Sequence, residues 1–146
     1  MSGQGGASGF SRFSAEASAV RAYIDSDILI WHLRGEARAL SFLSRLRDQG
    51  GYELWTGAMQ RAEIVFFMKP GEEEMTMLFL SRFKTAPVDQ AIVDEAGALY
   101  RRWHRSHGLD INDAILAATA MSTGGQVFCL NQKHYPMPDL MIKKAW

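Results

Sequence analysis

Short apolar segments alternate with longer segments of helical periodicity along most of this 146-residue chain, and this alternation most constrains its fold. The pattern predicts strands at 20–24, 52–55 and 127–130, an extended piece at 85–88 and a last strand at 140–142. It predicts helices at 28–33, 37–46, 58–69, 72–83, 89–107 and 110–121. Short apolar strands separated by helices are typical of a parallel sheet. The predicted fold class is α/β, with a central, mainly parallel sheet of four to five strands and helices on both faces.

The composition narrows the class of protein. The chain is 47% hydrophobic, which suffices for one core, and its 16 basic residues balance its 16 acidic ones. Zero net charge excludes a globally basic nucleic-acid wrapper but is compatible with a local basic patch. The single cysteine, Cys129, excludes a disulfide framework and favours a reducing cytosol.

The first 18 residues differ in composition from the rest of the chain. Residues 1–18 are mostly Gly, Ser and Ala, and we expect a flexible tail there, followed by a single domain over 19–146. No targeting segment is visible, and the apolar run Ile64–Met68 is too short to cross a bilayer. We therefore expect a cytoplasmic protein that does not enter a membrane.

Acidic residues follow the predicted strands or begin the helices after them. In an open parallel sheet, ligands bind beyond the carboxyl ends of the strands. Asp25 and Asp27 directly follow the first strand, and Asp113 lies in the first turn of its helix. An aspartate at such a junction is commonly a helix N-cap, and Asp110 is the better cap for the helix that contains Asp113.

Glu63 is harder to explain as a structural residue. Its neighbours Met59, Ala62, Phe66 and Phe67 are apolar, so we expect it on or beside a buried face. A buried carboxylate is costly unless it is paired or binds a metal. Three acids at one edge of a sheet would repel one another, and Mg²⁺ or Mn²⁺ would relieve that repulsion.

Four segments, in order and spacing, resemble the PIN-domain ribonucleases, and most closely the VapC-type toxins of bacterial VapBC toxin–antitoxin pairs. They are Tyr23-Ile-Asp-Ser-Asp-Ile-Leu-Ile30, Ala62-Glu63-Ile-Val, Ile111-Asn-Asp-Ala-Ile-Leu-Ala-Ala-Thr-Ala120 and Cys129-Leu-Asn-Gln-Lys-His-Tyr-Pro136. The resemblance covers 20–142 and implies a PIN-like domain. It also implies a homodimer and a groove that is buried under a VapB-like antitoxin.

The resemblance assigns roles to single residues. Asp25, Glu63 and Asp113 match the family's catalytic, metal-binding acids, and Asn131 falls where a fourth acid is often found. Ser26 matches a hydroxyl residue that orients a carboxylate. The implied chemistry is Mg²⁺- or Mn²⁺-assisted hydrolysis of RNA phosphodiester bonds. Asn131 is also expected in the catalytic site, where it can hydrogen-bond a metal-bound water but supplies no charge, so a second metal ion would bind weakly or need the RNA phosphate.

An acidic nuclease site needs positive charge nearby to hold the phosphate backbone. Arg101, Arg102 and Arg105 stand near the end of one predicted helix, and His134 follows Asn131. We expect these residues and Ser26 to contact RNA. The alternative for the arginines is that they complement the helix dipole.

Three other functions stay open on the sequence. A PIN-like nuclease could process RNA without being a toxin. A catalytically weakened PIN-fold binding module would explain Asn131. A haloacid-dehalogenase-type phosphatase would use Asp25 and Asp27, but the chain lacks the later lysine and paired acids of that family.

Overall fold

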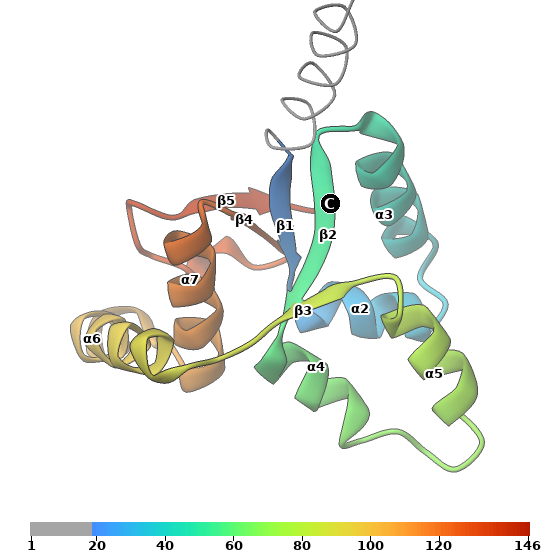
Figure 1. The fold of residues 1–146 in the computed structure, drawn as a ribbon, viewed down its shortest axis with the longest axis horizontal. Helices are drawn as coiled ribbons and strands as arrows, with labels where there is room; N and C mark the ends of the chain where they lie inside the picture. The colour runs from blue at the N-terminus through green and yellow to red at the C-terminus, as the bar shows by residue number, and fades with distance from the viewer. Residues whose placement is uncertain (1–18) are drawn as a thin grey trace, which may run out of the picture.

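The computed structural model describes residues 19–146, which form a five-stranded sheet with helices on both faces (Figure 1). All four strand pairings are parallel, in the order β3-β2-β1-β4-β5. The α/β prediction is confirmed, including the number of strands. The flexible tail predicted for residues 1–18 lies outside the described residues. The elements are β1 (Val20–Ile24), α2 (Ser26–Leu33), α3 (Ala37–Gln49), β2 (Tyr52–Gly57), α4 (Ala58–Val65), α5 (Glu73–Leu80), β3 (Lys84–Ala86), α6 (Gln90–His107), α7 (Ile111–Thr123), β4 (Gln126–Cys129), the 3₁₀ turn η1 (Gln132–His134) and β5 (Met141–Lys144).

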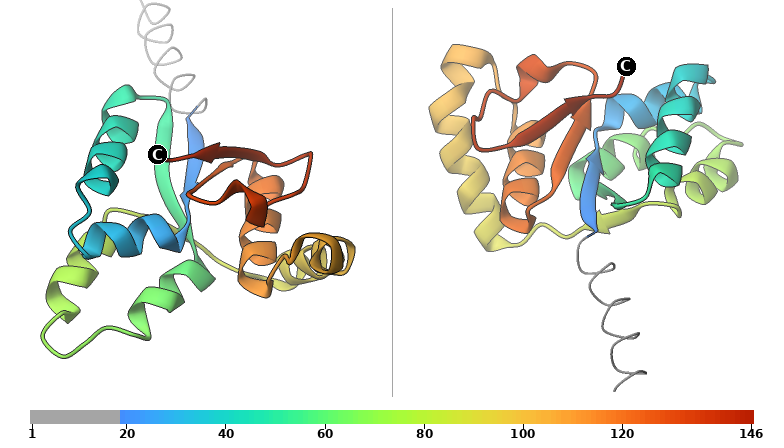
Figure 2. Two further views of the ribbon diagram at one scale, coloured as in Figure 1. Left: turned by 180° about the vertical axis from the view of Figure 1, so that it is seen from behind. Right: turned by 90° about the horizontal axis from the view of Figure 1, so that it is seen from above.

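The sheet separates two hydrophobic clusters because successive side chains of a strand point to opposite faces. In β1, Tyr23 packs with the cluster under α6 and α7, whereas Ala22 and Ile24 pack with the cluster under α2, α3 and α5. The views from behind and from above show these two helical layers on either side of the strands (Figure 2). The buried parts of β1 and β4, residues 22–24 and 127–129, are therefore apolar without interruption.

The helix caps predicted from the sequence are confirmed. Asp89 accepts from the Ile92 amide at 3.0 Å and Asp110 accepts from the Asp113 amide at 2.7 Å. Gly108 ends α6 with a φ of 67°, in the left-handed region that favours glycine. These local signals fix where α6 and α7 begin and where α6 ends.

The helix predicted over 58–69 is shorter than expected. Helix α4 ends at Val65, and the Lys69 amide donates to the Glu72 side chain at 2.8 Å instead of continuing the helix. Phe66 and Phe67 are 80% and 78% exposed, so the prediction that they belong to a buried face is wrong. Similarly, α5 covers only Glu73–Leu80 of the predicted 72–83.

None of the helices in residues 19–146 is both long enough and apolar enough to span a membrane.

Candidate active site

The predicted acids meet at the carboxyl edge of the sheet. Asp25 directly follows β1, Asp113 lies in the first turn of α7, and Glu63 lies on α4, which contacts both α2 and α7. In Figure 1, α4 and the start of α7 lie together below the ends of β1 and β2. Because β1 is paired with both β2 and β4, segments far apart in the sequence converge at this edge.

Asp25 is buried, and both of its carboxylate oxygens accept hydrogen bonds. Its Oδ1 accepts from the Ser26 amide at 2.7 Å, and its Oδ2 accepts from the Tyr135 hydroxyl at 2.7 Å. Asp25 is also the N-cap of α2. Its backbone is fixed further, because its amide donates to the Phe128 carbonyl at 3.0 Å.

Asp113 lies on the other side of the same tyrosine. Its Oδ1 is 3.2 Å from the Tyr135 hydroxyl oxygen, and its Oδ2 is 3.7 Å from His134 Nδ1. The Asp113 side chain is only 13% exposed. Tyr135 therefore joins the carboxylates of Asp25 and Asp113, and His134 stands at the solvent side of Asp113.

Glu63 is half-buried beside the buried Ile64 of α4, as expected, and neutral donors hold its carboxylate. Its Oε2 accepts from the Ser26 hydroxyl at 2.8 Å, and its Oε1 accepts from the Asn112 side chain at 3.0 Å. A carboxylate with one donor on each oxygen is fixed in orientation. The Ser26 hydroxyl, which the resemblance assigned to orienting a carboxylate, therefore orients Glu63.

Burial and repulsion between neighbouring charges make Asp25 and Asp113 reluctant to ionise. Burial, then the charges of Asp27 and Glu63, raise the pKa of Asp25 to about 6. Burial, then the charges of Asp25 and Asp110, raise the pKa of Asp113 to about 7. Within residues 19–146 no lysine or arginine forms an ion pair with Asp25, Glu63 or Asp113. The site thus concentrates negative charge that the described part of the chain does not neutralise.

Asp27 takes a structural position beside the acids. Its Oδ1 accepts from the Ile28 amide at 2.8 Å, and its Oδ2 lies 3.4 Å from the Leu130 amide. Burial raises its pKa. Asp27 therefore ties the start of α2 to the end of β4 and adds to the negative potential at Asp25.

Asn131 does not contact the three acids. It is exposed, and its Oδ1 accepts from the Lys133 amide at 3.1 Å. Its Nδ2 lies 3.2 Å from Nε2 of His134, the residue that approaches Asp113. Asn131 thus caps η1 and reaches the site through His134.

The predicted RNA-binding residues fall into two groups. Ser26 and His134 lie at the acids, as described above. Arg101, Arg102 and Arg105 are exposed on α6, and no hydrogen bond or ion pair links them to Asp25, Glu63 or Asp113 in the described part of the chain. The structure leaves their role in RNA binding as a prediction.

The sequence reasoning missed two residues of the site. Tyr135 lies in a segment that carried the family resemblance, but an apolar position before Pro136 reads as core. Asn112 directly precedes Asp113, and its amide donates to Glu63, 49 positions away. The sequence did carry one signal for Asn112: it is a polar residue directly beside Asp113, a predicted catalytic residue. Nothing local distinguishes the Tyr135 hydroxyl.

The donor set fits a hard divalent cation by its chemistry. Carboxylate oxygens are the ligands that Mg²⁺ and Mn²⁺ prefer, and a cation would offset the repulsion that raises the pKa of Asp25 and of Asp113. As they stand, no three His, Cys, Asp or Glu side chains of residues 19–146 are gathered as a metal site.

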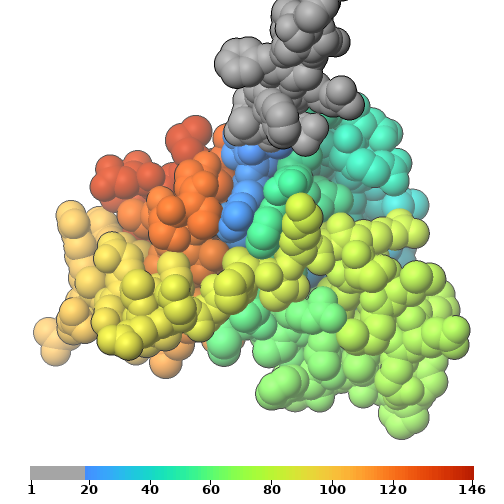
Figure 3. Space-filling view, in the orientation of Figure 1, coloured from blue at the N-terminus to red at the C-terminus, as the bar shows by residue number. Residues whose placement is uncertain are grey.

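Two cavities are relevant to partner binding: one adjoins the site, and the other lies away from it. One, of about 410 Å³, adjoins Glu63 and is lined by Arg34, Phe67 and Lys69, among others, from α2, α4 and the α4–α5 connection. In the space-filling view the α4–α5 segment forms a projecting lobe (Figure 3). This lobe exposes the apolar side chains of Phe66, Phe67, Met75 and Leu78.

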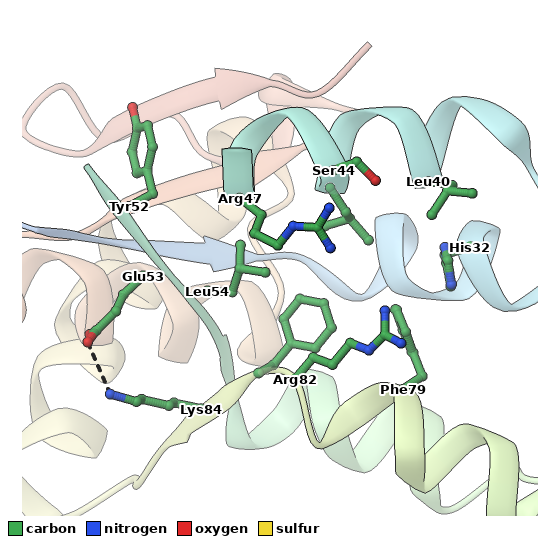
Figure 4. Close-up of a pocket in the computed structure, with 12 residues that line it drawn as sticks. His32, Leu40, Ser44, Arg47, Tyr52, Glu53, Leu54, Phe79, Arg82 and Lys84 are labelled. Carbon is green, nitrogen blue, oxygen red and sulfur yellow. Dashed lines mark hydrogen bonds and ion pairs between the residues drawn. The ribbon is translucent and has the colours of Figure 1, made fainter. Parts of the chain in front are cut away.

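The second cavity, of about 520 Å³, lies between α3, β2 and α5. We call it the cationic groove, because Arg47, Arg82 and Lys84 line it beside the apolar side chains of Leu54 and Phe79. The guanidinium groups of Arg47 and Arg82 point toward the same space (Figure 4). None of the predicted catalytic acids lines this groove.

Comparison with known proteins assigns the family. The sequence profile of the PIN domain matches residues 22–138. The chain is 35% identical over 115 residues to "Ribonuclease VapC10" of Mycobacterium tuberculosis, covering 78% of this chain and 85% of that protein. It is 34% identical over 119 residues to "Ribonuclease VapC19" of the same species, covering 80% and 94%. The chain belongs to the PIN-domain family, and its relatives are VapC ribonucleases.

Solved structures confirm the fold. A toxin–antitoxin complex from Klebsiella pneumoniae superposes with a TM-score of 0.69 at 23% identity, over 86% of this chain and 98% of that one. VapBC-1 from nontypeable Haemophilus influenzae gives 0.71 at 17% identity, with the same coverage. VapBC2 from Rickettsia felis, bound to a DNA fragment from its promoter, gives 0.69 at 19% identity.

Proposed function

We propose that this chain is a Mg²⁺- or Mn²⁺-dependent endoribonuclease, with Asp25, Glu63 and Asp113 as its metal-binding catalytic acids. The observation that carries the proposal is their convergence, held by neutral donors from Ser26, Asn112 and Tyr135. Acids that served stability alone would be paired with lysine or arginine, which would lower their pKa. Among residues 19–146, no lysine or arginine is paired with the three carboxylates.

The chain's own groups prepare the site in separate ways. Ser26 and Asn112 orient Glu63, and the Tyr135 hydroxyl lies 2.7 Å from Asp25 Oδ2 and 3.2 Å from Asp113 Oδ1. His134, 3.7 Å from Asp113, stands where it can meet a phosphate at the open side. A bound ion would supply an activated water and positive charge at the scissile phosphate.

We further propose that the chain is the toxin of a type II toxin–antitoxin pair, acting on RNA in the cytoplasm. Relatives named VapC and the folds of VapBC complexes support this. The cationic groove, with its apolar floor of Leu54 and Phe79, suits an acidic amphipathic segment of a VapB-like antitoxin. The exposed apolar side chains of the α4–α5 lobe suit a protein partner, including a second copy of the chain.

The test is incubation of the purified chain with total bacterial RNA in Mg²⁺, Mn²⁺ or EDTA. We expect metal-dependent cuts that vanish in Asp25→Asn and persist in Asp94→Asn, a matched exposed aspartate on α6. Metal-dependent cutting that survives in Asp25→Asn contradicts the site. No cutting by the folded, antitoxin-free chain favours a binding module, and cutting without growth arrest on expression favours RNA processing.

A further inference from the structure

Tyr135 stands between the two buried acids and has no role assigned so far. Its ring is 2% exposed and packs in the cluster that contains Leu116, Val127 and Leu140. Its amide donates to the Gln132 carbonyl at 3.0 Å, which closes the turn η1. Because both ring and backbone are fixed, the hydroxyl oxygen has a defined position at the sheet edge.

The hydroxyl contacts both acids at once. It lies 2.7 Å from Asp25 Oδ2 and 3.2 Å from Asp113 Oδ1. Within residues 19–146 no other side chain is hydrogen-bonded to both carboxylates. A phenol carries a single proton, so the hydroxyl donates to one carboxylate at a time: the shorter distance favours Asp25, and Asp113 is the alternative acceptor.

Two neighbouring carboxylates would turn apart in the absence of a cation, because like charges repel. A rigid hydroxyl between them opposes that movement. We propose that Tyr135 is a positioning residue that keeps the carboxylates of Asp25 and Asp113 convergent, so that a divalent cation meets a preformed pair. This inference rests on the proposed metal-dependent function and adds a residue to it.

The physical effect belongs to the hydroxyl and not to the ring. Phenylalanine at this position would keep the packing in the cluster and remove the contacts to Asp25 and Asp113. Partners that orient metal-binding side chains typically change metal affinity by about 10- to 100-fold. We therefore expect Tyr135→Phe to weaken Mn²⁺ binding by about tenfold with the fold retained.

The experiment is calorimetric titration of the metal-free full chain with Mn²⁺, for wild type, Tyr135→Phe and Tyr52→Phe. Tyr52 is the matched control, because its hydroxyl donates to Gln126 at 3.1 Å, away from the acids. Wild-type affinity in Tyr52→Phe and about tenfold weaker binding in Tyr135→Phe support the inference. Equal or tighter binding in Tyr135→Phe overturns it.

Two further measurements separate positioning from general damage to the fold. The first uses the wild type alone. In the wild type, the Tyr135 hydroxyl proton should exchange slowly with water in NMR spectra and shift when Mg²⁺ is added. Fast exchange with no shift overturns the inference. In Tyr135→Phe, raised Mg²⁺ should restore RNA cleavage, because the lost quantity is metal affinity.

The two proposals fail differently. A wild-type chain that binds Mn²⁺ but cuts no RNA contradicts the proposed ribonuclease and leaves the role of Tyr135 standing if Tyr135→Phe binds more weakly. If the chain cuts RNA but Tyr135→Phe binds Mn²⁺ as tightly as the wild type does, the proposed function holds and the positioning role is excluded. A wild-type chain that binds no Mn²⁺ overturns both.

Discussion

The acidic site and the cationic groove differ in the partners of their charged side chains. At the site, Asp25 is buried and Asp113 is half-buried beside it, and their hydrogen-bond donors are neutral groups. In the groove, two of the three cations have acidic partners: Arg47 with Asp48 and Lys84 with Glu53, each at 3.0 Å. The groove therefore offsets part of its charge by ion pairs, whereas within residues 19–146 no lysine or arginine is paired with the acids of the site.

The largest effect expected from this comparison concerns catalysis. Asp113→Asn, and likewise Glu63→Gln, should lower RNA cleavage by at least about 100-fold, the scale of losing one group that stabilises transition-state charge. The fold should not lose stability at neutral pH, because Asp113→Asn also removes repulsion from Asp25. Gel assays of cleavage and thermal unfolding measure the two effects. Full activity in either variant would break the assignment.

Metal addition should stabilise the wild type at pH 8. An ion that binds only the folded state at 100 times its Kd adds about 2.7 kcal/mol to the free energy of unfolding. Thermal unfolding in Mg²⁺ against EDTA measures the shift, and Asp25→Asn should lose it. An equal shift in both proteins would place the ion somewhere other than the acidic site.

Charge reversal in the cationic groove should change antitoxin binding without changing RNA cleavage at the acidic site. Arg82→Glu combined with Arg47→Glu should weaken binding to a VapB-like antitoxin by about tenfold or more, since like charges at an interface cost several kcal/mol. RNA cleavage by the free chain should stay unchanged, because none of the acids lines the groove. Undiminished binding would exclude the groove as the antitoxin site.

The acids also predict how stability depends on pH. The pKa of Asp25 and of Asp113 rises from 3.8 to about 6 and about 7, so between about pH 4 and 7 the folded state binds more protons than the unfolded chain. The stability that these groups contribute is present below pH 4 and is lost as pH rises toward 7.

In EDTA, the melting temperature of wild type relative to Asp113→Asn should fall by on the order of 5 °C across that window. The difference between the two proteins cancels other groups, including His32, whose pKa is lowered by burial. A difference that grows with pH in favour of the wild type would contradict the raised pKa of Asp113.

The smallest expected effect concerns Asn131, which stands where the family often has a fourth acid. Asn131→Asp should tighten Mn²⁺ binding about threefold, because it adds charge near the site but from an exposed position beside His134. Calorimetry measures the change, and Asp139→Asn is an exposed control. Equal or weaker affinity would show that Asn131 serves η1 alone.

Local patterns were enough to predict the strands, most helices and the edge at which the acids lie. Strand–helix alternation implies parallel strands, and parallel strands bring Asp25 and Asp113 to one edge. Asp89 and Asp110 cap their helices within three residues, so the sequence carries that information directly. The length of α4 was not predicted, because the apolar Phe66 and Phe67 extend the helical pattern beyond Val65 although both are exposed in the structure.

The amino-acid sequence by itself determined the class of fold, the order of its elements and the residue types of the acidic site. The tertiary structure decided which donors hold those acids. The Tyr135 hydroxyl meets Asp25 across 110 positions only because β4 lies beside β1, and Asn112 meets Glu63 only because α7 packs near α4. Periodicity and capping are local properties of a chain, whereas a contact between distant side chains depends on the packing of the whole sheet and its helices.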